Sequence, residues 1–168
     1  ADLTAAFIDA LQAAKKERNV LDFNDLEHFA LAVLCRDPAA LAGVEEADFR
    51  GEKGRTLRTD AAEDLREKYA VIMVDEYQDT NGVQELITHL VSGDDNRFMV
   101  GDIKQSIYRF RLADPTLFLD KYQSFSRDEK AVQRCIDLGR NFRSVPVILD
   151  AVNDVFSRAM TRDAAGLD

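Results

Sequence analysis

The residues Ala-Val-Ile-Met-Val-Asp-Glu-Tyr-Gln-Asp-Thr, 70–80, decide the fold class of this 168-residue chain. Residues 70–74 are a continuous apolar run with β-branched members, which predicts a central parallel strand that is covered on both faces. A second apolar run at 98–100 follows a helix that Asn81 and Gln84 are expected to begin. Strand, helix and strand within about 30 residues predict a βαβ unit, and therefore an α/β fold with a parallel sheet.

Further helices are predicted from apolar spacing and from capping residues. We expect the second helix to present Leu26, Phe29, Ala30, Val33 and Leu34 on one face. Residues 131–138 are a weaker strand candidate. The predicted helices run from Leu3 to Arg18, from a cap at Asn24 to Leu34, from Asp60 through Tyr69, from a cap at Asp114 through Tyr122, and from a cap at Ser144 through Phe156.

Residues 37–59 lose all apolar periodicity and collect three glycines among charged residues. This pattern predicts a long, flexible surface insertion with no part in the core. The tail from Thr161 has little apolar surface left to bury.

The composition excludes several classes of protein. With 46% hydrophobic and 32% charged residues, the chain is not disordered as a whole. Its formal net charge of −9 would repel nucleic-acid phosphates over most of the surface. Any contact with nucleic acid must therefore be confined to a small basic region. Cys35 and Cys135 form no metal-binding or disulfide pattern. Without a long apolar run or a secretory signal, we expect no membrane association and a cytoplasmic location.

Acidic side chains follow both predicted strands. Asp75 and Glu76 come directly after the first strand, and Asp102 follows the second. Because ligands bind beyond the carboxyl ends of parallel strands, we expect these residues to face one crevice. Asp75 could reach a hydrated Mg²⁺ while Glu76 deprotonates a water, which is typical of nucleotide hydrolysis. The alternative is that the Asp-Glu pair only begins a polar turn and caps the next helix.

Three segments, in this order, resemble motifs II, III and IV of the UvrD-like superfamily 1 DNA helicases. They are Val-Asp-Glu-Tyr-Gln-Asp-Thr at 74–80, Val-Gly-Asp-Ile-Lys-Gln-Ser-Ile-Tyr-Arg-Phe-Arg at 100–111 and Asn-Phe-Arg-Ser at 141–144. Residues 21–26 resemble the short motif that precedes them. Residues 101–115, followed by Phe-Leu-Asp-Lys-Tyr, are most similar to the AddA-type helicase-nuclease subunits.

The resemblance implies a partial RecA-like P-loop NTPase domain, with parallel strands flanked by helices. Residues 1–36 would be a helical segment that enters the first motor domain, and 37–59 the flexible insertion. Residues 60–130 would form the C-terminal half of RecA-like domain 1A, with motifs II and III. Residues 131–168 would begin RecA-like domain 2A, with motif IV.

The resemblance also implies roles in ATP hydrolysis. Asp75 would hold Mg²⁺, and Glu76 would be the general base. Gln105 would contact the γ-phosphate or the attacking water, for which an amide that both donates and accepts is suited. Arg143 would reach the γ-phosphate, and Phe142 would stack on adenine where many relatives carry Tyr. Without the flanking motif, Gln105 would be interpreted as a surface amide.

A third set of residues would bind DNA. Tyr108 and Phe110 alternate with Arg109 and Arg111, so the rings can point one way and the guanidiniums another. In this family the segment lines the single-stranded DNA path, where bases would stack on the rings. Arg109 and Lys104 would contact phosphates. The alternatives are core packing for the rings and solvated or paired charges for the cations.

As a whole, the resemblance implies part of an ATP-dependent DNA helicase or translocase of the AddA type, which acts in double-strand-break repair and recombination. Its cofactors would be ATP and Mg²⁺, and its partners single- or double-stranded DNA, the rest of the parent chain and an AddB-type subunit. The 168 residues contain no Gly-x-x-x-x-Gly-Lys-Ser/Thr loop, so we expect the fragment alone to be inactive. An exonuclease domain would lie elsewhere in the parent.

Two other classes of function remain open. One is a stand-alone, non-catalytic DNA-binding or adaptor domain that uses Tyr108 and Phe110. The other is a metal-dependent nuclease that uses Asp75, Glu76 and Asp102 and cleaves DNA without ATP. The chain has no lysine at nuclease spacing from these carboxylates, which disfavours the second class.

Overall fold

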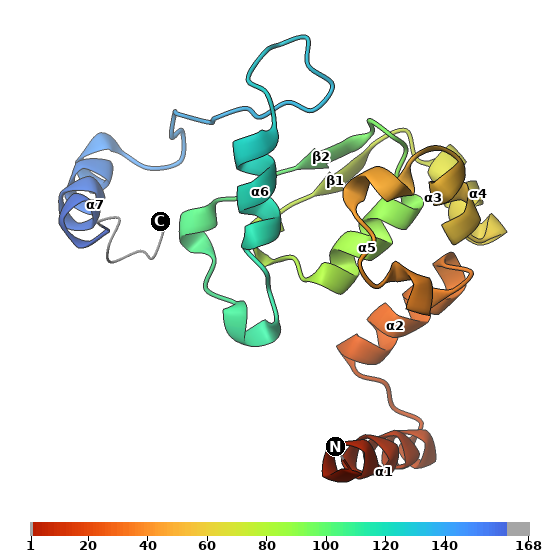
Figure 1. The fold of residues 1–168 in the computed structure, drawn as a ribbon. Coiled ribbons are helices and arrows are strands. Elements are labelled where there is room, and N and C mark those ends of the chain that lie inside the picture. Colours follow the sequence, from red (N-terminus) through yellow and green to blue (C-terminus); the bar gives the residue numbers. More distant parts are fainter. Residues whose placement is uncertain (1, 161–168) are drawn as a thin grey trace. The chain divides into compact units, whose positions relative to one another are not determined.

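The computed structural model describes residues 2–160, apart from the side chains of Asp2 and Arg111. Within this range the fold is α/β, mostly helical, with a small parallel sheet (Figure 1). The predicted tail from Thr161 lies outside the described residues. The elements are α1 (Asp2–Arg18), α2 (Phe23–Leu34), η1 (Pro38–Leu41), η2 (Glu46–Phe49), α3 (Gly51–Leu57), α4 (Asp60–Lys68), β1 (Ile72–Val74), η3 (Tyr77–Asp79), α5 (Gly82–Val91), β2 (Arg97–Met99), η4 (Ile103–Gln105), η5 (Arg109–Arg111), α6 (Thr116–Ser124) and α7 (Pro146–Ala159), where η marks a 3₁₀ turn.

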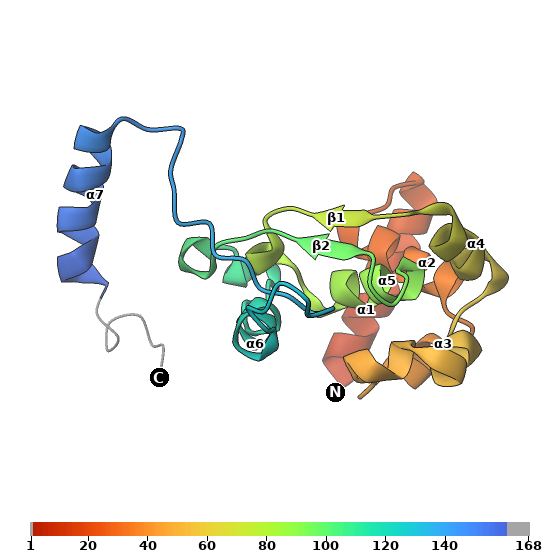
Figure 2. The ribbon, with the colours of Figure 1, turned by 90° about the horizontal axis from the view of Figure 1, so that it is seen from above.

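The predicted βαβ unit is confirmed. β1 and β2 pair in parallel, with Met73 opposite Phe98, and α5 lies between them in the sequence and beside them in space (Figures 1 and 2). The predicted cap of α5 is also confirmed. The Asn81 side chain accepts a hydrogen bond from the Gln84 backbone N–H at 2.8 Å, and the Gln84 side chain accepts one from the Asn81 N–H.

The sheet is not covered on both faces, so that prediction is wrong for the described residues. Met73 is 73% exposed and Phe98 is 48% exposed. These two residues are register partners, and side chains alternate between the faces of a strand, so both lie on the same face. β1 is also one of only two strands in the sheet that residues 2–160 form, so it is not central there. An apolar run in the sequence indicates that both faces of a strand are suited to burial, but it does not identify the residues that would cover each face.

The core lies among α2, α4 and α5, and the segment 37–59 contributes to it. Leu41, Phe49 and Leu57 are all buried in the same cluster as Leu31, Leu34 and Leu90. The prediction that this segment has no part in the core is therefore wrong. Each of its two 3₁₀ turns and the short helix α3 contributes one large apolar side chain to the core. These residues are therefore not spaced at the regular interval by which a longer amphipathic helix is recognised in a sequence.

The predicted cap and face of α2 are both corrected. Asp22, not Asn24, caps the helix: its side chain accepts the Asp25 N–H at 3.0 Å, and the Asp25 carboxylate accepts the Asp22 N–H at 2.9 Å. The buried residues of α2 are Asp25, Leu31 and Leu34. The other predicted members of its apolar face, Leu26, Phe29 and Val33, are each at least half exposed.

Asp25 also joins α2 to α1. Lys15 of α1 lies 2.9 Å from an Asp25 carboxylate oxygen and 2.6 Å from one of Asp22. The hydrogen bond from Lys15, together with the one from the Asp22 backbone, lowers the pKa of Asp25 to about 2. α1 is therefore held by charge, and its apolar residues Leu3 and Phe7 remain largely exposed.

By contact density the chain forms two units, residues 1–135 and 136–168. In the second unit, Pro146 is the first residue of α7 and Val145 is its cap, so the prediction that Ser144 caps this helix is wrong. The predicted strand at 131–138 is also not formed; a single parallel bridge joins Ser126 to Arg134 instead.

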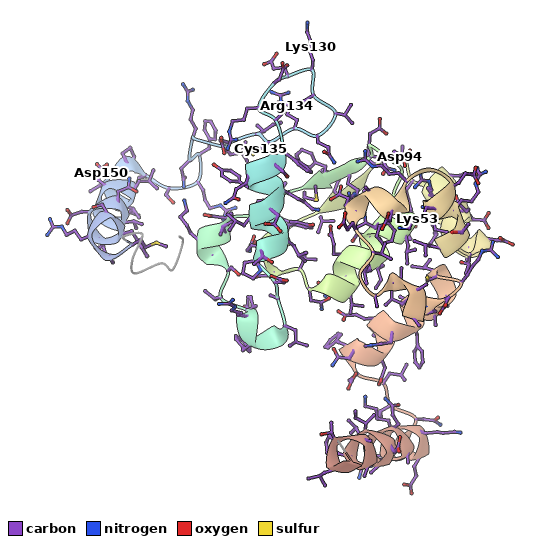
Figure 3. All side chains as sticks on the ribbon, viewed as in Figure 1. Lys53, Asp94, Lys130, Arg134, Cys135 and Asp150 are labelled. Carbon is purple, nitrogen blue, oxygen red and sulfur yellow. The ribbon has the colours of Figure 1, made fainter. Side chains whose placement is uncertain are left out.

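The two cysteines are free thiols, as predicted. Cys35 is buried and Cys135, labelled in Figure 3, is half-buried. None of the helices within residues 2–160 combines the length and the apolarity that crossing a membrane requires.

Gly54 allows α3 to pack against η2, and substitution there should destabilise the fold. A Cβ on Gly54 would overlap the Phe49 backbone carbonyl, which already accepts a 2.7 Å hydrogen bond from the buried Arg58. We expect Gly54→Ala to lower the free energy of unfolding by about 1–3 kcal/mol, as overpacking does. Urea titration of the chain measures this.

Gly82, the first residue of α5, is the matched control. A Cβ there meets no atom within 4 Å. Gly82→Ala should raise the free energy of unfolding by about 0.4–1 kcal/mol, because alanine restricts the unfolded chain. Equal effects of the two substitutions would contradict the packing described for Gly54.

Candidate functional site

Two loops follow the carboxyl ends of the strands and are joined to each other. We call residues 75–80 the first loop and residues 101–114 the second loop. The sheet's hydrogen bonding continues into them, because the Tyr77 N–H donates to the Val100 carbonyl at 2.8 Å. At the far end of the first loop, the Asp114 N–H donates to the Thr80 carbonyl at 3.0 Å. The loops therefore form one hydrogen-bonded junction at one end of the sheet.

Asp75 and Glu76 are exposed at the start of the first loop. The Asp75 Oδ1 accepts a hydrogen bond from the Glu76 backbone N–H at 2.9 Å. Glu76 itself has a φ of 48° and a ψ of 41°, the left-handed conformation. This conformation costs a residue with a Cβ about 1–2 kcal/mol. The turn therefore directs Glu76 out of the strand at the expense of backbone strain.

Gln105 lies at the same junction, and hydrogen bonds connect it to Glu76. The Gln105 Nε2 donates to the Asp102 Oδ2 at 3.1 Å, and the Asp102 backbone N–H donates to the Gln78 Oε1 at 3.0 Å. Gln78 Nε2 then donates to Glu76 Oε2 at 2.8 Å. The structure thus brings together Asp75, Glu76 and Gln105 at one end of the sheet, as the sequence predicts.

Gln78 is a residue that the sequence analysis missed. Its side chain is buried, with 1% of its surface exposed, and it lies between the two loops. Its position in a polar stretch suggested a turn residue, so apolar patterning gives no signal for it. Only the contact between Gln78 and the second loop, which requires the fold, distinguishes it from neighbouring polar residues.

Tyr77 anchors the first loop to the helical core. Its ring is fully buried and packs edge-on against Phe118 of α6, with ring centroids 5.7 Å apart. Its hydroxyl donates to the Glu85 Oε2 of α5 at 2.6 Å. Burial and the adjacent Glu85 carboxylate raise the pKa of Tyr77, so the hydroxyl remains protonated and keeps donating.

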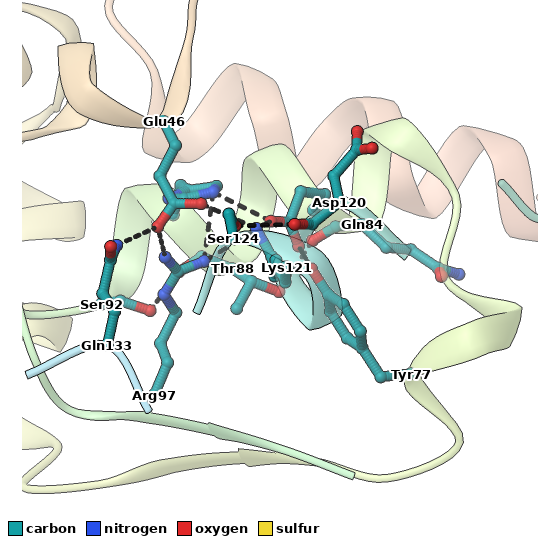
Figure 4. Close-up of polar contacts among 12 residues, drawn as sticks. Glu46, Tyr77, Gln84, Thr88, Ser92, Arg97, Asp120, Lys121, Ser124 and Gln133 are labelled. Atoms are coloured by element: carbon teal, nitrogen blue, oxygen red, sulfur yellow. Dashed lines mark hydrogen bonds and ion pairs between the residues drawn. The ribbon is translucent and has the colours of Figure 1, made fainter. Parts of the chain in front are cut away.

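Glu85 belongs to a largely buried ion network, of which Figure 4 labels Glu46, Arg97 and Lys121. Lys121 of α6 lies 3.0 Å from Glu85 and 2.7 Å from Glu46, and Arg97 of β2 lies 2.7 Å from Glu46. Burial alone would raise the pKa of Glu85, but hydrogen bonds from His89 and Tyr77 and the charge of Lys121 together lower it. The network joins η2, α5, β2 and α6.

Among the described residues, this network contains the one group of side chains whose ligand atoms are close enough to hold a metal ion. Ligand atoms of Glu46, Glu85 and His89 lie within 4.8 Å of one another. Lys121 and Arg97 already pair with these carboxylates, so a cation there would face two positive charges at contact distance. We therefore interpret the cluster as structural.

The aromatic residues of the second loop are exposed. Tyr108 is 38% exposed and Phe110 is 76% exposed, and their ring centroids lie 5.7 Å apart. Core packing, the alternative for these rings, is therefore wrong. Arg109 and Lys104 are exposed as well, and Lys104 lies 3.8 Å from Asp102. The side chain of Arg111 lies outside the described residues.

Phe142 and Arg143 belong to the second unit. Phe142 is 90% exposed, and Arg143 is exposed too. Asn141 shapes this segment, because its Oδ1 accepts the backbone N–H groups of Arg143 and Ser144, each at 2.9 Å. The bend therefore presents both side chains to solvent.

A large apolar groove borders the ion network and the second loop, because Glu46, Glu85, Lys121 and Leu112 are among the residues that line it. It has a volume of about 670 Å³ and is lined by α2, η2, α5 and α6, with Val83, Leu86 and Leu117 among its residues. None of Asp75, Glu76 and Gln105 lines it. The candidate site is therefore the exposed loop junction and not this groove.

Comparisons with known proteins give one consistent result. Residues 1–126 match the model of the UvrD/REP helicase N-terminal domain. Proteins whose names describe them as ATP-dependent helicase/nuclease subunits are similar over almost the whole chain: that of Alkaliphilus oremlandii (strain OhILAs) is 43% identical over 166 residues, 99% of this chain. That of Heliobacterium modesticaldum (strain ATCC 51547 / Ice1) is 46% identical over 181 residues, 95% of this chain. The chain spans 12% of the length of each.

The ion network should make stability depend on pH. Because the folded pKa of Glu85 is lowered, its contribution is complete above the unfolded value of 4.5 and is lost as the pH falls toward the folded value. We expect Glu85→Gln to be destabilised near neutral pH by about 3–5 kcal/mol, as for a broken buried pair. This difference from the wild type should shrink progressively in urea titrations as the pH falls below 4.5. Glu52→Gln, at a 90% exposed position, should follow the wild type at every pH.

At Glu76, which has a left-handed conformation, a glycine variant should be more stable than an alanine variant, the reverse of the usual order within a helix. We expect Glu76→Gly to be more stable than Glu76→Ala by about 1 kcal/mol, because only glycine adopts this conformation without strain. At Asp64, which is exposed within α4, the glycine variant should be less stable than the alanine variant by about 1 kcal/mol. The same ranking at both positions in thermal or urea unfolding would rule out strain at Glu76.

Proposed function

Because this chain belongs to the UvrD/REP helicase N-terminal domain family, we propose that it forms part of an ATP-dependent DNA helicase. In this proposal 74–80, 100–111 and 141–144 act as motifs II, III and IV, and the βαβ unit is part of a RecA-like domain. The main support is the loop junction: hydrogen bonds join Glu76 and Gln105 at the carboxyl end of a parallel sheet. Ligands bind at this edge in open α/β sheets.

In ATP hydrolysis the exposed carboxylate of Glu76 acts as the general base. It accepts a proton from a water whose oxygen attacks the γ-phosphorus, the bond to the β-phosphate oxygen breaks, and ADP and phosphate are released. Gln105 contacts the γ-phosphate or the attacking water. Arg143 stabilises the charge on the γ-phosphate, and Phe142 stacks on the adenine, which its 90% exposure supports.

Asp75 is the residue that would hold Mg²⁺. Its carboxylate is exposed beside Glu76, and carboxylate oxygens are ligands that this ion prefers. When bound, the ion would neutralise charge on the phosphates. The chain's own contribution is the turn that separates the two carboxylates, since the Glu76 N–H holds the Asp75 Oδ1 at 2.9 Å.

Single-stranded DNA is the proposed ligand of the second loop. Tyr108 and Phe110 present exposed rings on which bases can stack, a contact worth about 1–3 kcal/mol per base. Arg109, Arg111 and Lys104 contact phosphates. With a net charge of −9 for the chain, such contact must be confined to this segment.

The complete protein is proposed to be an AddA-type helicase-nuclease that acts with an AddB-type subunit in double-strand-break repair and recombination, in the cytoplasm. The names of the relatives, which describe ATP-dependent helicase/nuclease subunits, and their similarity over almost the whole chain support the helicase-nuclease part of this proposal. The chain has no Gly-x-x-x-x-Gly-Lys-Ser/Thr loop, so the 168 residues alone are proposed to hydrolyse no ATP. Residues elsewhere in the complete protein would hold the phosphates and supply any exonuclease activity.

The test is DNA-stimulated ATP hydrolysis by the complete protein that contains this chain. Glu76→Gln should lower kcat by about 10²–10⁴-fold, because the general base is lost. The affinity of this variant for a fluorescent ATP analogue should stay within about threefold of the wild type, because the general base contributes little to the binding of unreacted ATP. Glu67→Gln, an exposed carboxylate on α4, is the control and should leave both quantities unchanged. Normal turnover by Glu76→Gln would reject the proposed role.

A further inference from the structure

The side chain of Gln78 is the only buried amide at the loop junction among the described residues, and all of its donors are used. Its Nε2 donates to Glu76 Oε2 at 2.8 Å and to Asp79 Oδ2 at 3.3 Å. Its Oε1 accepts the Asp102 backbone N–H at 3.0 Å. One neutral group thus connects two carboxylates of the first loop to the backbone of the second.

The second loop holds this amide in place. A Cβ on Gly101 would lie 2.5 Å from Gln78 Oε1 and 3.2 Å from the Phe118 ring, so a larger residue at this position would have to displace the amide. The Ser106 hydroxyl also donates to the Gln78 backbone carbonyl, at 3.4 Å. Confined in this way, the amide keeps one rotamer and one direction of donation.

The hydrogen bonds also form a directed series. Gln105 donates to the Asp102 carboxylate, the Asp102 backbone donates to Gln78, and Gln78 donates to Glu76. The series ends at the Glu76 carboxylate. A displacement of the segment that carries Gln105 therefore changes the contact that orients the Glu76 carboxylate.

We propose that Gln78 is a positioning residue, whose amide orients the Glu76 carboxylate and couples it to the loop that carries Gln105. This inference rests on the proposed function and deepens it. An amide suits the role because it donates to a carboxylate without a charge and without titrating. An alanine would release Glu76, and a glutamate would repel it.

The test compares Gln78→Glu with Gln84→Glu in the complete protein. Gln84 is the matched control, because its amide also donates to a carboxylate, Glu27 Oε1, at 2.8 Å, but on the exposed face of α5. For Gln78→Glu we expect kcat for ATP to fall by about tenfold or more with a KM within about threefold. Gln84→Glu should retain the wild-type values.

Titration with a fluorescent ATP analogue separates positioning from mere structural damage. In Gln78→Glu the new carboxylate faces Glu76 and Asp79, the two carboxylates to which the Gln78 amide donates in the wild type. We expect this variant to bind the analogue with the stoichiometry and affinity of the wild type, because only the orientation of Glu76 changes. A loss of binding stoichiometry in proportion to the fall in kcat would overturn the proposal, because a purely structural defect removes active molecules.

A reciprocal exchange keeps the test decisive if Gln78→Glu folds poorly. The double variant Glu76→Gln with Gln78→Glu restores one amide and one carboxylate at the same contact. Its midpoint of thermal unfolding should recover toward the wild type, while ATP hydrolysis stays at the level of Glu76→Gln. If the exchange recovers no stability over Gln78→Glu, the amide–carboxylate contact is not the one described, and the proposal is wrong.

The two proposals fail in different ways. If the wild-type complete protein hydrolyses no ATP, the proposed function fails, and the positioning role fails with it, whatever the exchange does to stability. If the wild type hydrolyses ATP and Gln78→Glu keeps the wild-type kcat, only the positioning role is wrong.

Discussion

The hydrogen bond from the Tyr77 hydroxyl to the buried Glu85 carboxylate determines where the first loop lies. Tyr77 is fully buried, so its backbone position is fixed by the packing of α5 and α6 and not by the loop itself. Its neighbours in the sequence, Glu76 and Gln78, are hydrogen-bonded to each other beside this anchor. Glu85 can accept this bond as an anion because Lys121 and Arg97 lie within 3.5 Å of it. The exposed carboxylates thus depend on a charge network whose members Glu85, Lys121 and Arg97 are largely buried.

Anchoring at Tyr77 also explains why strain at Glu76 is tolerated. The left-handed turn costs about 1–2 kcal/mol, and the contacts that oppose its relaxation are the Tyr77 N–H bond to Val100, the Asp75 bond to the Glu76 N–H and the Gln78 amide. Strained residues persist where surrounding contacts over-determine them, and they concentrate at functional sites. The strain at Glu76 is therefore consistent with a carboxylate that has to point away from its strand.

The sequence predicted the parts of the fold that local chemistry controls. The parallel pairing, the Asn81 cap and the grouping of Asp75, Glu76 and Gln105 follow from an apolar run, a capping box and the direction of parallel strands. It failed where burial depends on distant partners. Leu41, Phe49 and Leu57 enter the core without any period, Met73 remains exposed in an apolar strand, and Asp22 forms the capping box in place of Asn24. Gln78 was missed for the same reason, because its importance comes from a loop that follows it by more than 20 residues.

The charges at the loop junction limit what can bind there. The two loops carry more acidic than basic residues: the acidic ones are Asp75, Glu76, Asp79, Asp102 and Asp114, and the basic ones are Lys104, Arg109 and Arg111. A polyphosphate brought to this edge alone would meet net negative charge, and the −9 charge of the chain would add to the repulsion. The proposed function therefore needs additional positive charge at this edge, such as that of a divalent cation or of residues outside the two loops. In the same proposal Glu76 acts as the base, and the buried Gln78 amide donates to its carboxylate without adding a charge.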